Sequence, residues 1–120
     1  MTTIDPMTAP AQEVYDWLAE RDGYTRQTCP INGKSGWFRT SKGGYAEGAF
    51  DGESNPITID RLSEMLPEGY FWDCVRQVSP GDWFAEVAAK ADNVAFDRYA
   101  PSEREARARV VAAVLMRDNP

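Results

Sequence analysis

The stretch that most constrains the fold is residues 100–118, which read APSEREARARVVAAVLMRD. Ser102 precedes Glu105 by three residues, and this spacing is the signature of a capping box at the start of a helix. A helix is therefore predicted over 102–117. Its apolar residues recur at helical spacing and predict the face that lies on a sheet, namely Ala108, Val111, Ala112 and Leu115.

A second apolar stripe runs along the same helix, at Val110, Ala113 and Val114. The helix is therefore apolar around much of its circumference, and such a helix is either deeply buried or covered by a partner. If Val110 and Val114 are exposed, they are candidates for a partner-binding or self-association surface, with a homodimer as one outcome.

The rest of the chain predicts an α+β domain. Helices are expected near 9–21, where Gly23 follows the end, and near 58–66, where Thr58 is a good N-cap. Alternating or β-branched runs, bounded by turn dipeptides, favour short strands within 24–29, 37–40, 45–50, 70–78, 83–90 and 94–99. We expect an antiparallel sheet of about four strands packed with helices, sandwich-like, with the C-terminal helix on the sheet.

A length of 120 residues favours one domain, expected over 9–120, and residues 1–8 are expected to be a disordered lead-in. The N-terminus reads MTTIDPMTAP and lacks the basic and apolar regions of a signal peptide. No run approaches the ~20 apolar residues of a membrane span. The expected location is the cytoplasm, without membrane association.

Composition argues against several kinds of chemistry. The chain has no histidine, which is the usual general base and the commonest metal ligand, and only two cysteines, Cys29 and Cys74. Residues 32–35 read NGKS, like the end of a phosphate-binding loop, but Thr28 stands where that motif needs an earlier glycine. We therefore expect no catalytic, cofactor-binding or metal-binding residues, and no enzyme.

The charge pattern suggests a protein partner. The net charge is −6, and acids concentrate between Glu47 and Asp73. These acids could imitate a nucleic-acid backbone and occupy a basic cleft on another protein, although a solvated surface explains them more simply. The candidate partner-binding acids are Glu47, Asp51, Glu53, Asp60 and Glu64.

The alternative partner is nucleic acid, through a basic and aromatic loop over 26–45. Its candidate residues are Arg26, Lys34, Trp37, Arg39 and Lys42. Basic side chains of this kind contact phosphates while aromatic rings stack on bases. An edge hairpin with its rings packed inward accounts for the same pattern. The acidic net charge disfavours nucleic acid, because phosphate contacts dominate that affinity.

Several segments resemble the small phage and prophage proteins grouped as the phage ABA sandwich domain family. They are the step Asp22-Gly23-Tyr24, the run ITIDRLSEMLPEGYFWDC over 57–74, and GDWFAEV over 81–87 ahead of the C-terminal helix. The resemblance covers about residues 12–117 and consists of packing motifs. It implies an α/β/α sandwich and a phage or prophage origin, and it brings no catalytic residues.

The C-terminal half is also similar, at the level of fold, to double-stranded RNA-binding domains. Those domains carry lysines at the start of the last helix, where this chain has Ser102-Glu103-Arg104-Glu105. Two acids at that place would repel a duplex. The sequence therefore favours a non-enzymatic phage or prophage accessory protein that binds another protein, with inhibition of a host defence system as one form of that role.

Overall fold

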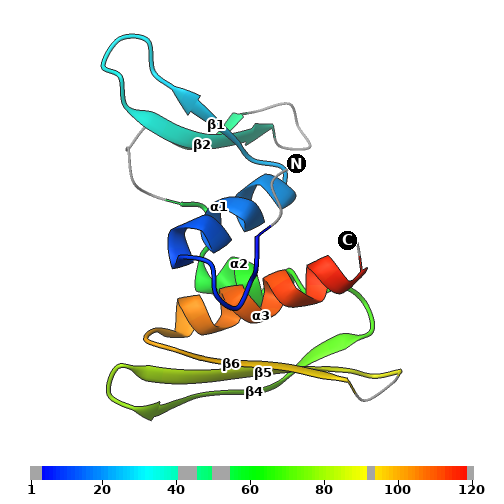
Figure 1. Cartoon of the computed structure of the whole chain (residues 1–120). Coiled ribbons are helices and arrows are strands. Elements are labelled where there is room, and N and C mark those ends of the chain that lie inside the picture. Colours follow the sequence, from blue (N-terminus) through cyan, green and yellow to red (C-terminus); the bar gives the residue numbers. More distant parts are fainter. Residues whose placement is uncertain (1–3, 41–45, 50–54, 92–93, 119–120) are drawn as a thin grey trace. The chain divides into compact units, whose positions relative to one another are not determined.

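The computed structural model describes residues 4–40, 46–49, 55–91 and 94–118 (Figure 1). The chain divides into two compact units. We call Met1–Val14 with Thr58–Pro120 the terminal unit, and Tyr15–Ile57 the inserted unit. The boundary falls within α1 (Ala11–Arg21). The single domain expected over 9–120 stays a prediction.

The terminal unit is built on a three-stranded antiparallel sheet in the order β4-β5-β6. Its strands are β4 (Tyr70–Ser79), β5 (Asp82–Ala89) and β6 (Ala95–Ala100). The two-residue loop between β4 and β5 contains Gly81, whose positive φ of 75° suits a tight turn. The helices α2 (Ile59–Glu64) and α3 (Glu103–Asp118) lie on the same side of this sheet (Figure 1).

The core of the terminal unit lies between α3 and the sheet. Alternate residues of β5 point toward the helix, as a strand period of two requires, and Ala85 and Val87 are fully buried. Val110 and Val114 of α3, one turn apart, pack against them. The buried cluster consists of Ala85, Val87, Ala100, Ala106, Val110 and Val114.

This packing corrects the prediction for α3. Val110 and Val114 have no exposed surface and form part of the core, so they do not form an exposed partner or dimer surface. The residues predicted to lie on the sheet include Ala108, Val111 and Ala112, which are also fully buried but lie outside that cluster. Because α3 is apolar around most of its circumference, its sequence did not reveal which stripe meets the sheet.

The start of α3 follows the predicted capping pattern. The backbone N–H of Glu105 donates a hydrogen bond to the Ser102 hydroxyl over 3.1 Å. Replacing Ser102 with alanine removes this acceptor and is expected to lower the free energy of unfolding by about 1 kcal/mol. Chemical denaturation measures the change. Ser79→Ala, at the exposed end of β4, is the control and should stay within about 0.5 kcal/mol of the parent. An equal loss in both variants would show that the cap contributes nothing particular.

The segment ahead of α1 is fixed to α3, where the sequence suggests a disordered lead-in. The N–H groups of Thr8 and Ala9 donate to the Asp5 carbonyl and close a turn. The Met7 N–H donates to the Asp5 carboxylate, and this bond is the main cause of a lowered pKa at Asp5. Arg109 of α3, which is 8% exposed, forms hydrogen bonds with this segment.

The Arg109 guanidinium makes three hydrogen bonds. Its Nη1 donates to the carbonyl of Ala9 over 2.7 Å and to that of Pro6 over 3.2 Å, and its Nε donates to Glu105 over 3.0 Å. The two bonds to the carbonyls of Pro6 and Ala9 join positions 103 and 100 residues apart in the chain. Arg109 of α3 therefore connects the C-terminal helix to the segment ahead of α1.

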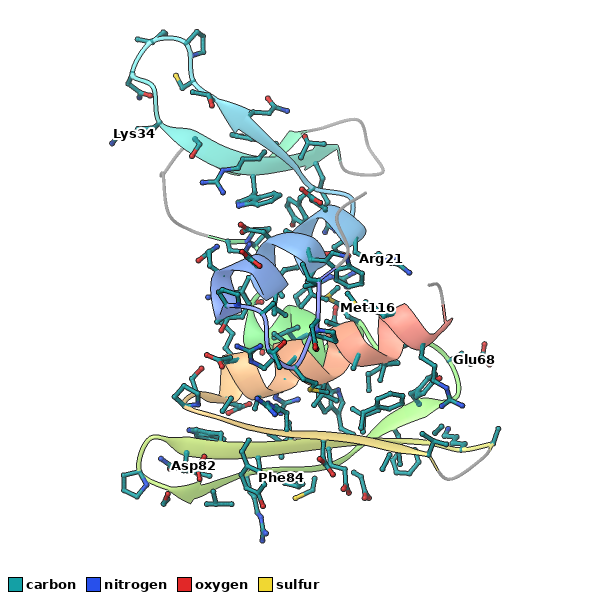
Figure 2. All side chains as sticks on the ribbon, viewed as in Figure 1. Arg21, Lys34, Glu68, Asp82, Phe84 and Met116 are labelled. Atoms are coloured by element: carbon teal, nitrogen blue, oxygen red, sulfur yellow. The ribbon has the colours of Figure 1, made fainter. Side chains whose placement is uncertain are left out.

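The inserted unit contains a second three-stranded antiparallel sheet, in the order β1-β2-β3. Its strands are β1 (Thr25–Thr28), β2 (Ser35–Thr40) and β3 (Ala46–Ala49). Gly23 follows α1 with a φ of 92°, as the predicted helix end requires. Figure 2 shows Lys34 at the loop end of the β1–β2 hairpin.

The predicted α+β class, the three helices and the position of the C-terminal helix on a sheet are confirmed. The described strands differ in their arrangement, since they form two separate sheets where about four strands in a single sheet were expected. Strand pairing between distant segments depends on contacts that local patterns do not encode.

Candidate functional site

The structure scatters the acids that were candidates for partner binding. Asp60 and Glu64 are exposed on α2, and Glu64 forms an ion pair with Arg61 at 3.4 Å. Glu47 lies in β3, opposite Arg39 in the strand register. Asp51 and Glu53 lie outside the described residues. Of the five candidate acids, two side chains are therefore placed, both on one short helix.

The nucleic-acid candidates are largely engaged within the inserted unit. Trp37 is 6% exposed, so its ring offers little surface for stacking on a base. The Arg26 guanidinium lies 5.6 Å from the centroid of that ring and forms an ion pair with Asp16 at 3.8 Å. Lys34 is exposed in the hairpin loop, and Lys42 lies outside the described residues.

Arg39 is held in the same manner as Arg26. Its Nη1 donates to the Asp22 carboxylate and to the Asp22 carbonyl, each over 3.3 Å. Its guanidinium also lies 4.7 Å from the centroid of the Tyr24 ring. Arginines held by carboxylates and rings of the same unit are less available for phosphates, so the alternative of nucleic-acid binding gains no support here.

A different surface stands out in the terminal unit. The residues of β4, β5 and β6 that alternate with the core residues point away from α3, and we call this side the outer face. Figure 2 shows Phe84 on the side of the sheet away from α3. By the strand register, the outer face consists of Phe71, Cys74, Arg76, Phe84, Glu86, Ala88, Ala95, Asp97 and Tyr99, with Asp73 in the β4 bulge beside Cys74.

Three aromatic rings lie on the outer face. Tyr99 is 56% exposed and Phe71 is 40% exposed. Phe84 and Tyr99 are opposite each other in register, and their ring centroids are 4.8 Å apart at an angle of 45°. Large apolar groups gathered on one exposed surface are characteristic of interaction sites, whereas isolated ones are ordinary.

A row of three carboxylates crosses the middle of the outer face. Glu86 of β5 is opposite Asp97 of β6 and next to Cys74 and Asp73 of β4. Hydrogen bonding with Asp73 raises the pKa of Glu86, as do desolvation and the negative charges of Asp73 and Asp97. Among the residues that the structure describes, no salt bridge involves any of the three.

Sequence reasoning missed the outer face. The alternation of Phe84 and Glu86 with the core residues of β5 was visible, but their neighbours on β4 and β6 depend on register. A bulge between Trp72 and Cys74 shifts the pairing of β4 with β5. No local sequence motif predicted this bulge. The proximity of Glu86, Asp73 and Asp97 is thus a tertiary feature.

The described residues contain no group of three or more histidine, cysteine, aspartate or glutamate side chains arranged to hold a metal ion. Cys29 and Cys74 are free, half-buried thiols in different units. Asp82 is opposite Ser79, at the turn end of β4 and β5, while Asp73 lies at the bulge. These two aspartates do not form a carboxylate pair across the strands.

In the part of the chain that the structure describes, the helices are too short or too polar to cross a membrane. Comparison of the chain with protein-family models, with curated proteins and with solved structures found no match. The outer face of the β4-β5-β6 sheet is therefore identified as the candidate site on its own geometry.

Proposed function

We propose that this protein is a non-enzymatic binding protein that contacts another protein through the outer face. The observation that carries the proposal is a set of three rings on one side of a sheet whose other side is packed against α3, namely the exposed Phe71 and Tyr99 and the half-buried Phe84. Aromatic residues are enriched at protein interfaces because they bury much area with few rotatable bonds.

The finer role follows from the sequence resemblance. A phage or prophage accessory protein in the cytoplasm of a bacterial cell would find its partner among host or phage proteins, and a component of a host defence system is one such partner. The carboxylate row disfavours binding of nucleic acid to the outer face, because Asp73, Glu86 and Asp97 would repel phosphates.

The variant that tests this function is Phe84→Thr combined with Tyr99→Thr. Threonine keeps the β-propensity of both strands while removing the rings, and neither residue belongs to the buried core. We expect the tagged parent protein to capture a partner from host lysate, and the double variant to lose at least about 90% of it, since hot-spot rings each contribute roughly 2 kcal/mol or more. Quantitative mass spectrometry of the captured proteins measures the loss.

Ile31→Thr is the matched control. Ile31 is 93% exposed in the β1–β2 hairpin loop, so the change removes exposed apolar surface from the inserted unit, which does not contain the outer face. Capture should survive in this variant. Equal capture by the parent and the double variant would contradict the proposal. Loss of a dimer in sedimentation of the double variant would instead identify the partner as a second copy.

A further inference from the structure

We infer that the outer face binds a protein segment that presents arginine or lysine side chains, with the cations held between the carboxylate row and the exposed rings. This inference rests on the proposed function and specifies the chemistry of the partner. It does not depend on the origin of the protein or on the identity of its target.

The first argument is charge complementarity. Glu86 of β5 lies between Asp73 of β4 and Asp97 of β6, so carboxylates are opposite each other on neighbouring strands. Like charges in this arrangement destabilise a sheet. Neighbouring strands are about 4.8 Å apart, so the row spans roughly 10 Å. A partner cation would relieve the repulsion and would meet carboxylates that have no salt bridge within the described part of the chain.

The second argument is a motif that the protein repeats internally. Among the described residues, several arginines lie over an aromatic ring and pair with a carboxylate. Arg39 combines Tyr24 with Asp22, and Arg26 combines Trp37 with Asp16. Arg107 lies 4.7 Å from the Trp72 ring centroid and donates to Glu103 over 2.9 Å.

The outer face offers the same ring and carboxylate groups. Phe84 precedes Glu86 by two residues on the same side of β5, and Tyr99 follows Asp97 by two on the same side of β6. An arginine that spans either step would contact a ring face and a carboxylate together. Such contacts are worth about 0.5–2 kcal/mol for the cation–π part and more for a charge-assisted hydrogen bond.

The outer face has one arginine of its own, Arg76, and it does not pair with the Glu86 carboxylate in the described part of the chain. Arg76 is opposite Phe84 on β4 and is exposed. Within the described residues it takes part in no salt bridge with Glu86, and every influence on the pKa of Glu86 raises it. Within the described part of the chain, the three carboxylates therefore have no cation that forms a salt bridge with them.

The test uses a short fluorescein-labelled peptide of alternating arginine and serine, with a glutamate and serine peptide of equal length as the control probe. Fluorescence anisotropy at low and at physiological salt gives the affinity. The triple variant Asp73→Asn, Glu86→Gln, Asp97→Asn should bind the arginine peptide at least about tenfold more weakly than the parent.

The matched control is Asp60→Asn, Glu64→Gln, Glu68→Gln, which removes the same charge from exposed positions on and after α2. Its affinity should stay within about twofold of the parent. An equal loss in both triple variants would mean general attraction to an acidic protein and would overturn the inference, as would a larger loss in the α2 variant or a parent that binds neither peptide.

The two proposals fail separately. If the partner captured from lysate is lost with Phe84→Thr, Tyr99→Thr but retained by the carboxylate triple variant, the outer face binds a protein that is not recognised by its cations. If the arginine peptide binds through the carboxylates but lysate yields no partner, the surface chemistry stands and the proposed function does not.

Discussion

Replacing Val110 with aspartate is expected to unfold the terminal unit. Val110 has no exposed surface and packs against Val87 and Ala85 of the sheet, so the carboxylate would lose its hydration without gaining a partner. The penalty is several kcal/mol whether the group is buried charged or forced to take up a proton. Because a domain of this size is stable by only about 5–15 kcal/mol, most molecules should lose their fixed structure. Circular dichroism and thermal melting measure the loss.

Val94→Asp is the control with the same chemical change. Val94 is 39% exposed, so its aspartate stays in water and the melting temperature should shift by only a few degrees. Intermediate damage is expected for Val110→Thr, which keeps the shape and buries only a hydroxyl. A folded Val110→Asp protein that dissociates from a dimer would restore the partner surface first inferred from the sequence and refute the packing of α3 on the sheet.

Replacing Arg109 with methionine is expected to cost about 3 kcal/mol of unfolding free energy. Methionine keeps most of the aliphatic packing but removes every donor. The carbonyls of Pro6 and Ala9 and the carboxylate of Glu105 would then lose their shared partner in a largely buried place. Urea denaturation measures the cost, and hydrogen exchange should show earlier opening of residues 5–9.

Arg109→Lys separates charge from geometry. An ammonium group keeps the positive charge but lacks the planar fork that reaches two carbonyls and a carboxylate, so we expect roughly half the loss. Arg76→Met on the exposed outer face should change stability by less than about 0.5 kcal/mol. If Arg109→Met were as mild as Arg76→Met, the N-terminal segment would owe its position to something other than this arginine.

Local features of the fold were predictable because their causes are local. The helix bounds expected at 58–66 and 102–117 compare with Ile59–Glu64 and Glu103–Asp118, and both N-caps, Thr58 and Ser102, bind the backbone N–H three residues ahead. Capping needs only residues within one turn of each other. The strand at 70–78 followed in the same way from its aromatic and β-branched residues, the strand at 83–90 from alternation, and both from the turn between them.

The candidate site was not predictable from the sequence. The residues proposed for a partner were chosen by charge density along the chain, which placed them on α2, in β3 and outside the described residues. Glu86, Asp73 and Asp97 come from three strands, and nothing within any one strand marks them as neighbours. The basic and aromatic loop was visible, but whether its arginines were available depended on Asp16 and Asp22, which lie in and just after α1.

The sequence by itself determined that the chain is an α+β protein, that it has helices near 9–21, 58–66 and 102–117, and that its last helix is too apolar to stand alone. The tertiary structure decided which stripe of α3 meets the sheet, how the strands divide into two sheets, and which charged and aromatic side chains share the outer face. The reason is physical: helical period, strand alternation and caps arise from neighbours in the chain, while strand register and the choice between two apolar faces depend on side chains brought together only by folding.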